Sequence, residues 1–149
     1  MTDDDLAARL RALARHRSIL GAPGFSFGEW VDAGRNADGT LSLGWYRLSD
    51  AAEAFVRDVG GAGWIVPFDW PAWMATAEAQ ALVTDHARIA GASVEELSRL
   101  LTAIVRSDRF TEGSMAGAFE SGLIGAILER AEVLAGEFGP TREGPAGTT

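Results

Sequence analysis

The first run of apolar positions along the chain has the spacing of a helix. Thr2, followed by three aspartates, offers an N-cap and negative charge at the positive end of the helix dipole. Arg9, Arg11, Arg15, His16 and Arg17 lie mostly on the rest of its surface. Gly21 and Pro23 supply the end of the element. The pattern predicts an amphipathic N-terminal helix with a solvated basic side. Its apolar stripe consists of Leu6, Leu10, Leu13 and Leu20.

The period of the pattern changes between residues 25 and 48. Leu41, Leu43 and Trp45 alternate with small or polar residues, and the preceding stretch 32–39 is rich in Gly, Asn and Asp. Alternation on one side of a polar stretch is typical of a β-hairpin. We therefore predict two antiparallel strands joined by a long loop.

A short helix and a third strand are predicted after the hairpin. Asp50 and Glu53 form a capping pair at the start of this helix, and the small residues 60–63 end it. Four small residues in a row suggest a phosphate loop, but in such a loop the glycines lead from a strand into a helix. Here they lead from a helix into the apolar run 64–66, which predicts a turn followed by a strand.

The second half of the chain is predicted to be helical. Asp69 or Trp70 would cap a helix that continues to about Val83. The capping box at 93–96 opens the most regular helix, and a break near 110–113 leads to the last one.

These elements predict an α+β fold. We expect a small sheet of about three strands, a hairpin plus one strand, packed against four to five helices. Residues 1–138 are expected to form a single globular domain, and residues 139–149 a disordered C-terminal tail because that stretch is Gly- and Pro-rich.

Composition restricts the available chemistry. The 149 residues include no cysteine, no lysine and two histidines, and the net charge is −8. Thiolate chemistry, disulfides and lysine Schiff bases are thereby excluded. The acidic balance argues against binding to nucleic acid or to an anionic membrane. No catalytic template or metal-ligand spacing is present, so we expect no cofactor and no metal. No apolar stretch has the length of a membrane helix and no signal peptide is recognised, so we expect a cytoplasmic location.

A dense group of charges near residue 108 is the first candidate site. Two arginines and two carboxylates occupy seven positions beside apolar residues. An arginine there could hold an anion bidentately, or the group could be a structural network that ties two helices together at a bend. Tryptophans of the 67–73 segment would supply apolar area to a ligand. The candidate ligand- or partner-binding residues are Arg106, Asp108, Arg109, Glu112, Trp70, Trp73 and Asp69.

Small residues recur every four positions in the last part of the chain. Glycine inside a helix costs up to about 1 kcal/mol relative to alanine, so such a stripe needs a reason. Close approach of another backbone within the molecule is the first explanation, a homodimer contact is the second, and a groove that admits a ligand is the third. The stripe consists of Gly113, Gly117, Ser121 and Gly125.

Three motifs together resemble those of a family of small uncharacterised bacterial proteins, catalogued as a domain of unknown function. They are GFxxGEW at 24–30, PFDWxxW at 67–73, and RxDRFxEG at 106–113 followed by FESG at 119–122. The resemblance covers about residues 10–135 and implies no established activity, although some members lie beside macro-type ADP-ribose-binding modules. Many members carry Cys and His where this chain has Thr111 and Ser114, so a mechanism built on those side chains is not expected here.

Any function must therefore rest on arginine, carboxylates and tryptophan. This favours a non-catalytic binding or interaction module of a soluble bacterial protein, with a small anionic ligand or a protein as its partner. The alternative is a hydrolase-like enzyme acting on a nucleotide-like or ADP-ribose-type substrate, with Asp108 or Glu112 as base and Arg109 as electrophile. A structural homodimer is the third hypothesis.

Overall fold

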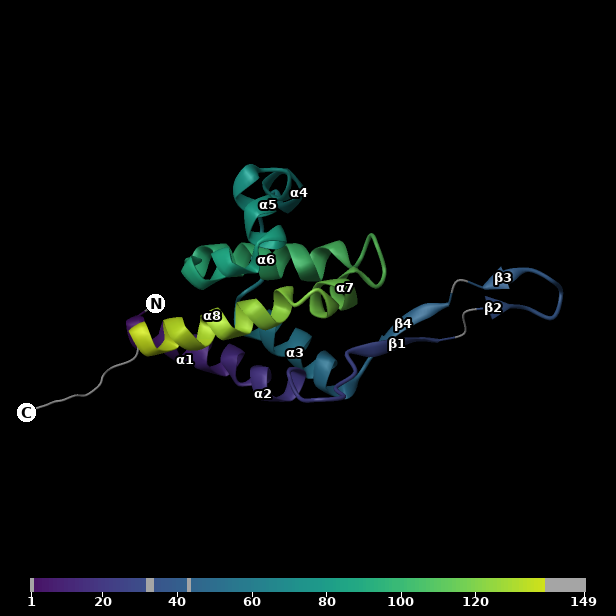
Figure 1. Ribbon diagram of the computed structural model, residues 1–149, viewed down its shortest axis with the longest axis horizontal. Coiled ribbons are helices and arrows are strands. Elements are labelled where there is room, and N and C mark those ends of the chain that lie inside the picture. Colours follow the sequence, from purple (N-terminus) through teal and green to yellow (C-terminus); the bar gives the residue numbers. More distant parts are fainter. Residues whose placement is uncertain (1, 32–33, 43, 139–149) are drawn as a thin grey trace, which may run out of the picture.

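The computed structural model describes residues 2–31, 34–42 and 44–138. Helices form the body of the molecule, and a β-hairpin, here called the arm, projects from one end of it (Figure 1). The predicted α+β class is confirmed. The helices are α1 (Asp3–Ala14), α2 (His16–Leu20), α3 (Asp50–Gly61), α4 (Trp70–Met74), α5 (Ala77–Thr84), the 3₁₀ helix η1 (His86–Gly91), α6 (Val94–Ser107), α7 (Ser114–Glu120) and α8 (Leu123–Phe138).

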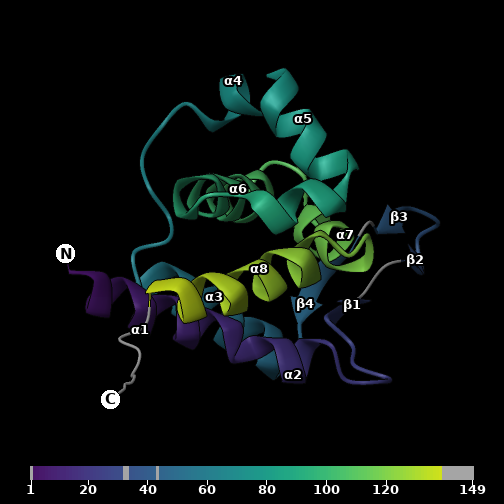
Figure 2. The same ribbon diagram turned by 60° about the vertical axis from the view of Figure 1, so that its left-hand side comes forward.

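The body is layered around α8. Helices α1, α2 and α3 lie on one side of α8, α6 lies on the other, and α4 and α5 cover the outer side of α6 (Figure 2). Helix α7 packs between the ends of α6 and α8. This arrangement leaves a space bounded by α4, α5, α6 and α7, in which the candidate site lies.

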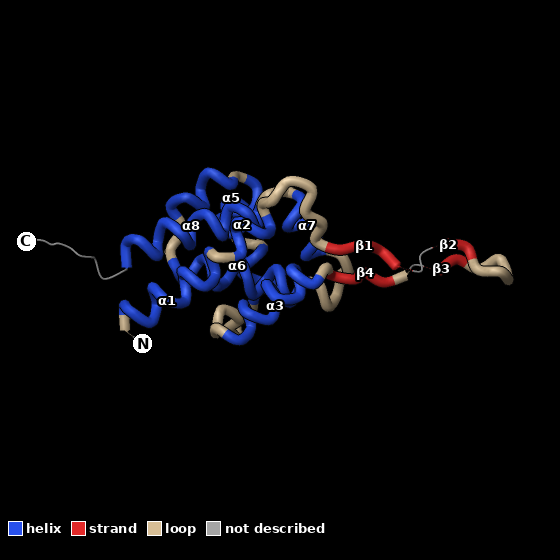
Figure 3. Tube along the Cα trace, turned by 90° about the horizontal axis from the view of Figure 1, so that it is seen from below, coloured by secondary structure: helices blue, strands red, loops and turns tan. Residues whose placement is uncertain are grey.

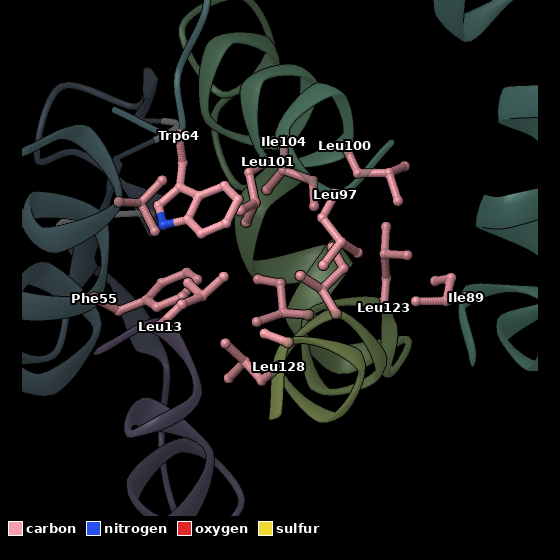
Figure 4. Close-up of a cluster of buried hydrophobic side chains, with 14 of the residues drawn as sticks. Leu13, Phe55, Trp64, Ile89, Leu97, Leu100, Leu101, Ile104, Leu123 and Leu128 are labelled. Carbon is pink, nitrogen blue, oxygen red and sulfur yellow. The ribbon is translucent and has the colours of Figure 1, made fainter. Parts of the chain in front are cut away.

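The core fills the space between these layers. Helix α6 presents Leu97, Leu100 and Leu101 to it at helical spacing, and all three are fully buried. Trp64 and Phe55 enter from the opposite side (Figure 4). Burial of such large apolar side chains is the main force that holds the layers together, at about 1.5–3 kcal/mol for each.

The predicted N-terminal helix is two helices. The regular turn is interrupted at Arg15, between α1 and α2. His16, expected on the solvated side, is only 8% exposed, and its Nε2 lies 2.9 Å from a carboxylate oxygen of Asp58 on α3. The pattern could not show this, because the partner carboxylate lies 42 positions away in the sequence.

The predicted third strand at 64–66 is wrong. This segment has no strand partner among the described residues and packs along α6 instead. The carbonyl of Trp64 accepts a hydrogen bond from Ser98 Oγ at 2.6 Å, and the N–H of Val66 donates to Thr102 Oγ1 at 3.0 Å. Side chains of a helix therefore satisfy the backbone groups for which a sheet was expected.

The arm consists of two antiparallel ladders that follow one another outward (Figure 3). Strand β1 (Gly28–Val31) pairs with β4 (Trp45–Leu48), with Trp30 opposite Tyr46. Farther out, β2 (Gly34–Arg35) pairs with β3 (Leu41–Ser42). The hairpin prediction is thus correct, although Leu43 lies outside the described residues.

Three helix boundaries differ from the prediction. Ser49, not Asp50, is the N-cap of α3 and accepts the N–H of Ala52. The helix expected from about 70 to 83 is interrupted before Thr76, which caps α5. The last helix is divided into α7 and α8 at Gly122, whose φ of +92° is a conformation that favours glycine. The predicted capping box at Ser93 is confirmed.

No helix among the described residues is both long and apolar enough to cross a membrane. The tail that was predicted to be disordered, residues 139–149, lies outside the described part of the chain.

Candidate functional site

A cavity of about 300 Å³ lies between α4, α5, α6 and α7, and we call it the Trp70 pocket. Its volume is at the lower end of the range for ligand pockets. Apolar side chains dominate its lining, three serines supply hydroxyl groups, and no charged side chain takes part. The lining residues are Trp70, Met74, Val83, Leu100, Ala103, Ile104, Ser107, Ser114, Gly117, Ala118, Ser121 and Leu123.

The pocket exists because one wall is built from small residues. Gly117 and Ala118 on α7 face the cavity together with Ser121, which follows that helix. No heavy atom outside its own helix lies within 4 Å of the position that a Cβ of Gly117 would occupy. Helix α6 forms the facing wall with Ala103 and Ser107, so neither wall fills the space between them.

Two aromatic rings lie at one side of the pocket. Trp70 is the first residue of α4, and the Asp69 carboxylate caps this helix by accepting the N–H of Ala72 at 3.2 Å. The Trp70 ring lies 6.2 Å from the ring of Phe110, with 39° between their planes. Phe110 is 80% exposed, which is unusual for a phenylalanine. A ligand in the pocket would therefore meet an aromatic wall and a second ring available for contact.

A pair of hydroxyl groups provides the polar part of the pocket. Ser107 Oγ and Ser114 Oγ are 3.1 Å apart and join the end of α6 to the start of α7. Ser107 Oγ also donates to the carbonyl of Ile104 at 3.1 Å. The pair is therefore fixed by the two helices and is not a mobile surface feature.

The two carboxylates of the predicted charged cluster hold the turn between α6 and α7. Asp108 Oδ1 accepts the N–H groups of Gly113 at 3.1 Å and Met115 at 3.0 Å. Glu112 Oε2 accepts the N–H of Tyr46 on β4 at 2.7 Å. Each carboxylate thus has a backbone partner, one within the turn and one on the arm.

The two arginines of the cluster are not paired with these carboxylates. Within the described residues, the side chains of Arg106 and Arg109 make no hydrogen bond or ion pair. Arg109 is exposed and Arg106 is half-buried. The four residues therefore lie at the end of α6 and in the turn that follows it, without the predicted ion-pair network, and none of them lines the Trp70 pocket.

The two candidate tryptophans have different environments. Trp70 lines the pocket, whereas Trp73 is 8% exposed and belongs to the core. The Trp73 indole N–H donates to Glu78 Oε1 at 3.3 Å, which satisfies its polar atom. Of the seven candidate residues, only Trp70 is in the lining of this cavity.

The small-residue stripe does not mark a close crossing of two backbones. Gly117 and Gly125 both have open space where a Cβ would be, so the first explanation is wrong for them. Gly113 is different, because its φ is +93° and a Cβ there would lie 2.8 Å from Cζ2 of Trp30. Gly117 and Ser121 instead line the Trp70 pocket, in agreement with the third explanation, a groove.

The two serines of the hydroxyl pair are not among the residues predicted for the site. Ser107 lies inside the 106–113 motif and Ser114 directly follows it, but the prediction there rested on charged side chains. A usable signal was present: small residues at 117 and 121 on one flank of a helix, after a turn that contains hydroxyl groups. Pairing Ser107 with Ser114, however, required knowledge of how α7 folds back on α6.

The pKa of Tyr46, the single tyrosine, depends on the carboxylates around the α6–α7 turn. Burial raises the pKa of the Tyr46 hydroxyl above its ordinary value of 10.0, and the carboxylates of Glu120 and Asp108 raise it further. The aromatic ring packs edge-on against Trp30 with centroids 5.3 Å apart. Charges in and near the α6–α7 turn therefore act on a side chain at the base of the arm.

A larger groove of about 750 Å³ lies along α2 and α8. Two arginines line it, and one of them, Arg17, is paired with Glu132 at 2.6 Å and with Glu129 at 3.1 Å. Its volume alone does not make it the better candidate, because both of its glutamates already have a cationic partner. In the part of the chain that is described, no group of three or more acidic or histidine side chains is placed to hold a metal ion.

The fold and the site together define a small helical domain with an apolar, hydroxyl-bearing pocket beside a structured turn. The chain belongs to the family of unknown function DUF6508, which matches residues 6–137. The predicted membership of a domain family of unknown function is thereby confirmed. Neither a curated protein nor a solved structure matches the chain.

Proposed function

We propose that this domain is a non-catalytic binding module, and that it takes an uncharged apolar molecule or group into the Trp70 pocket. The observation that carries the proposal is the uncharged lining of this pocket, in which an exposed space remains between Trp70 and the small residues Gly117 and Ser121. Apolar side chains that line this pocket are exposed to water, and a ligand that covers them removes apolar surface from water, at about 25 cal/mol for each Å² buried.

The chemistry of the carboxylates supports binding over the alternative hydrolase. A general base needs a lone pair directed at its substrate. One oxygen of each carboxylate, Oδ1 of Asp108 and Oε2 of Glu112, is instead engaged with backbone N–H groups and fixes the turn. Their roles are thus structural in this proposal. A small anionic ligand would have to use Arg106 and Arg109, which lie outside the pocket and have no ion-pair partner within the described residues.

A ligand screen with a filled-pocket variant tests the proposal. Benzyl alcohol, 1-octanol and naphthalene should each raise the melting temperature of the wild-type protein if they bind the folded state. Gly117→Leu places a side chain in the pocket and should abolish the shift. Gly136→Leu is the matched control, because Gly136 is also a helical glycine with open space around it but lies outside this lining.

Two outcomes would contradict the proposal. One is the absence of any shift with all three probes, and the other is an equal shift in the wild type and in Gly117→Leu. Hydrolysis of ADP-ribose or of a nucleotide by the purified protein, lost in Asp108→Asn, would favour the enzyme.

A homodimer through Gly113, Gly117, Ser121 and Gly125 remains a separate prediction. The four residues lie on α7, on α8 and in the turns that precede them, and not on a single helix. Sedimentation of the wild type tests it, and a monomer that stays monomeric at high concentration would contradict it. The bacterial source and cytoplasmic location expected from the sequence belong to this proposal as well.

A further inference from the structure

We infer that the ligand of the Trp70 pocket is an uncharged two-ring aromatic molecule with one hydrogen-bonding group, held by the hydroxyl pair of Ser107 and Ser114. This inference rests on the proposed function and adds the chemical class of the ligand. Volume, charge, aromatic lining and hydroxyl geometry each restrict that class.

The volume sets the size of the ligand. An apolar protein cavity of about 150 Å³ holds one benzene ring. The Trp70 pocket measures about 300 Å³, which corresponds to two fused rings. A dinucleotide or a long lipid would extend far beyond this space.

The lining sets the charge of the ligand. Burial of an ionised group without a partner costs far more than burial of a neutral polar group. None of the lining side chains is charged, and the nearest arginines in sequence, Arg106 and Arg109, are not among them. The inserted part of the ligand is therefore neutral.

The wall favours a flat ring over a flexible chain. Aromatic pairs prefer offset or edge-to-face arrangements with centroids 4.5–7 Å apart, and these contribute about 0.5–1.5 kcal/mol beyond the buried area. Trp70 offers such a face inside the pocket, and Phe110, 6.2 Å from it, exposes most of its ring. A bound ring can thus contact Trp70 and bring Phe110 out of water.

The hydroxyl pair accommodates the polar group of the ligand. When Ser107 donates to the carbonyl of Ile104, Ser114 donates to Ser107 and keeps its lone pairs for a ligand O–H or N–H. When Ser107 turns its proton to Ser114, the Ser114 proton is available to a ligand carbonyl. Ser114 is therefore the residue that decides this contact in either arrangement.

Matched probes test the inference. Dissociation constants are measured for 2-naphthol, naphthalene, 2-naphthoate and 1-octanol with the wild type, Ser114→Ala and Ser121→Ala. Ser121 is the control, because it also lines the pocket but its hydroxyl already donates to the carbonyl of Ala118 and accepts the N–H of Leu123. In the wild type, 2-naphthol should bind about tenfold more tightly than naphthalene, as expected for one added hydrogen bond. Ser114→Ala should remove that advantage, whereas Ser121→Ala should retain it.

The outcomes separate this inference from the proposed function. Equal affinity of 2-naphthol and naphthalene overturns the role of the hydroxyl pair, and binding of 2-naphthoate as tight as that of 2-naphthol overturns the neutral class. Binding of 1-octanol without binding of naphthalene overturns the aromatic class. In these three cases the pocket still binds and the proposed function stands. If none of the four probes binds, both the inference and the proposed function fail.

Discussion

One oxygen of the Asp108 carboxylate lies 3.1 Å from the backbone nitrogen of Gly113 and accepts its hydrogen bond. The same oxygen accepts the N–H of Met115 in the first turn of α7. A single side chain thus fixes both the turn and the start of the helix that forms the small-residue wall of the Trp70 pocket. Since the pocket depends on the position of α7, the carboxylate supports the site without lining it.

Removal of this carboxylate should destabilise the fold. Asp108→Ala leaves two half-buried N–H groups without their acceptor, and hydrogen bonds to charged groups contribute about 1.5–3 kcal/mol each. We expect a loss of about 3 kcal/mol in the free energy of unfolding, the lower end of that range for two bonds, measured by urea denaturation. Asp108→Asn should lose less, because its amide oxygen can still accept. Equal stability of Asp108→Ala and the wild type would contradict the assigned role.

Two glycine-to-alanine substitutions should have opposite effects. Gly113 has a φ of +93°, and a Cβ there would lie 2.8 Å from the Trp30 ring, so Gly113→Ala should destabilise by about 2 kcal/mol or more. Gly136 is in α8 with open space around it, so Gly136→Ala should stabilise by up to about 1 kcal/mol. Thermal denaturation of both variants measures the difference. A Gly113→Ala protein as stable as the wild type would show that Trp30 does not pack against the turn.

Much of the local structure could be predicted because it depends on near neighbours. The capping box at Ser93, the cap at Asp69 and the hairpin each rest on contacts between residues close in the sequence. The segment 64–66 was misassigned because its backbone is bonded to Ser98 and Thr102, more than thirty positions away. An apolar run has the same composition whether a helix or a neighbouring strand bonds to its backbone, so the sequence pattern could not distinguish the two.

The candidate site was predictable only in part for the same reason. The 106–113 motif and Trp70 were expected to lie near one another, and the Trp70 ring lies 6.2 Å from the ring of Phe110 in that motif. The roles of Asp108 and Glu112 depend on which backbone N–H groups approach them, and Tyr46, the partner of Glu112, lies 66 positions away. The pocket itself lies between four helices, so its position depends on their packing and cannot be predicted from any single stretch of the sequence.

The tyrosine offers an independent test of the turn. Tyr46 is the only tyrosine in the chain, so the change in ultraviolet absorbance on tyrosine ionisation can be assigned to it. Burial, Glu120 and Asp108 raise the pKa of its hydroxyl above 10.0. The neutral form is favoured by the fold, so this contribution to stability is present below pH 10 and is lost as pH rises through the raised pKa. Glu120→Gln should lower the midpoint of the titration, and an unchanged midpoint would contradict the electrostatic effect of Glu120 on the Tyr46 hydroxyl.

The capping box at the start of α6 should make the free energy of unfolding depend on pH in the acidic range. The backbone N–H of Ser93 donates to the Glu96 carboxylate at 3.0 Å and lowers the pKa of Glu96 below its ordinary value of 4.5. Its contribution is therefore present above pH 4.5 and is lost as pH falls through the lowered pKa. Glu96→Gln should be less stable than the wild type at pH 7, by a difference that shrinks below pH 4.5. A difference independent of pH would contradict this.

The most direct test of the binding site is a titration of the ¹⁵N-labelled protein with naphthalene, followed by backbone amide chemical shifts. If the Trp70 pocket binds the probe, the amides of Gly117, Ala118 and Ser107 should shift in a saturable manner. These shifts should be absent in Gly117→Leu and retained in Gly136→Leu. Saturable shifts confined to other parts of the chain, or no shifts at all, would contradict the assignment of the Trp70 pocket as the binding site.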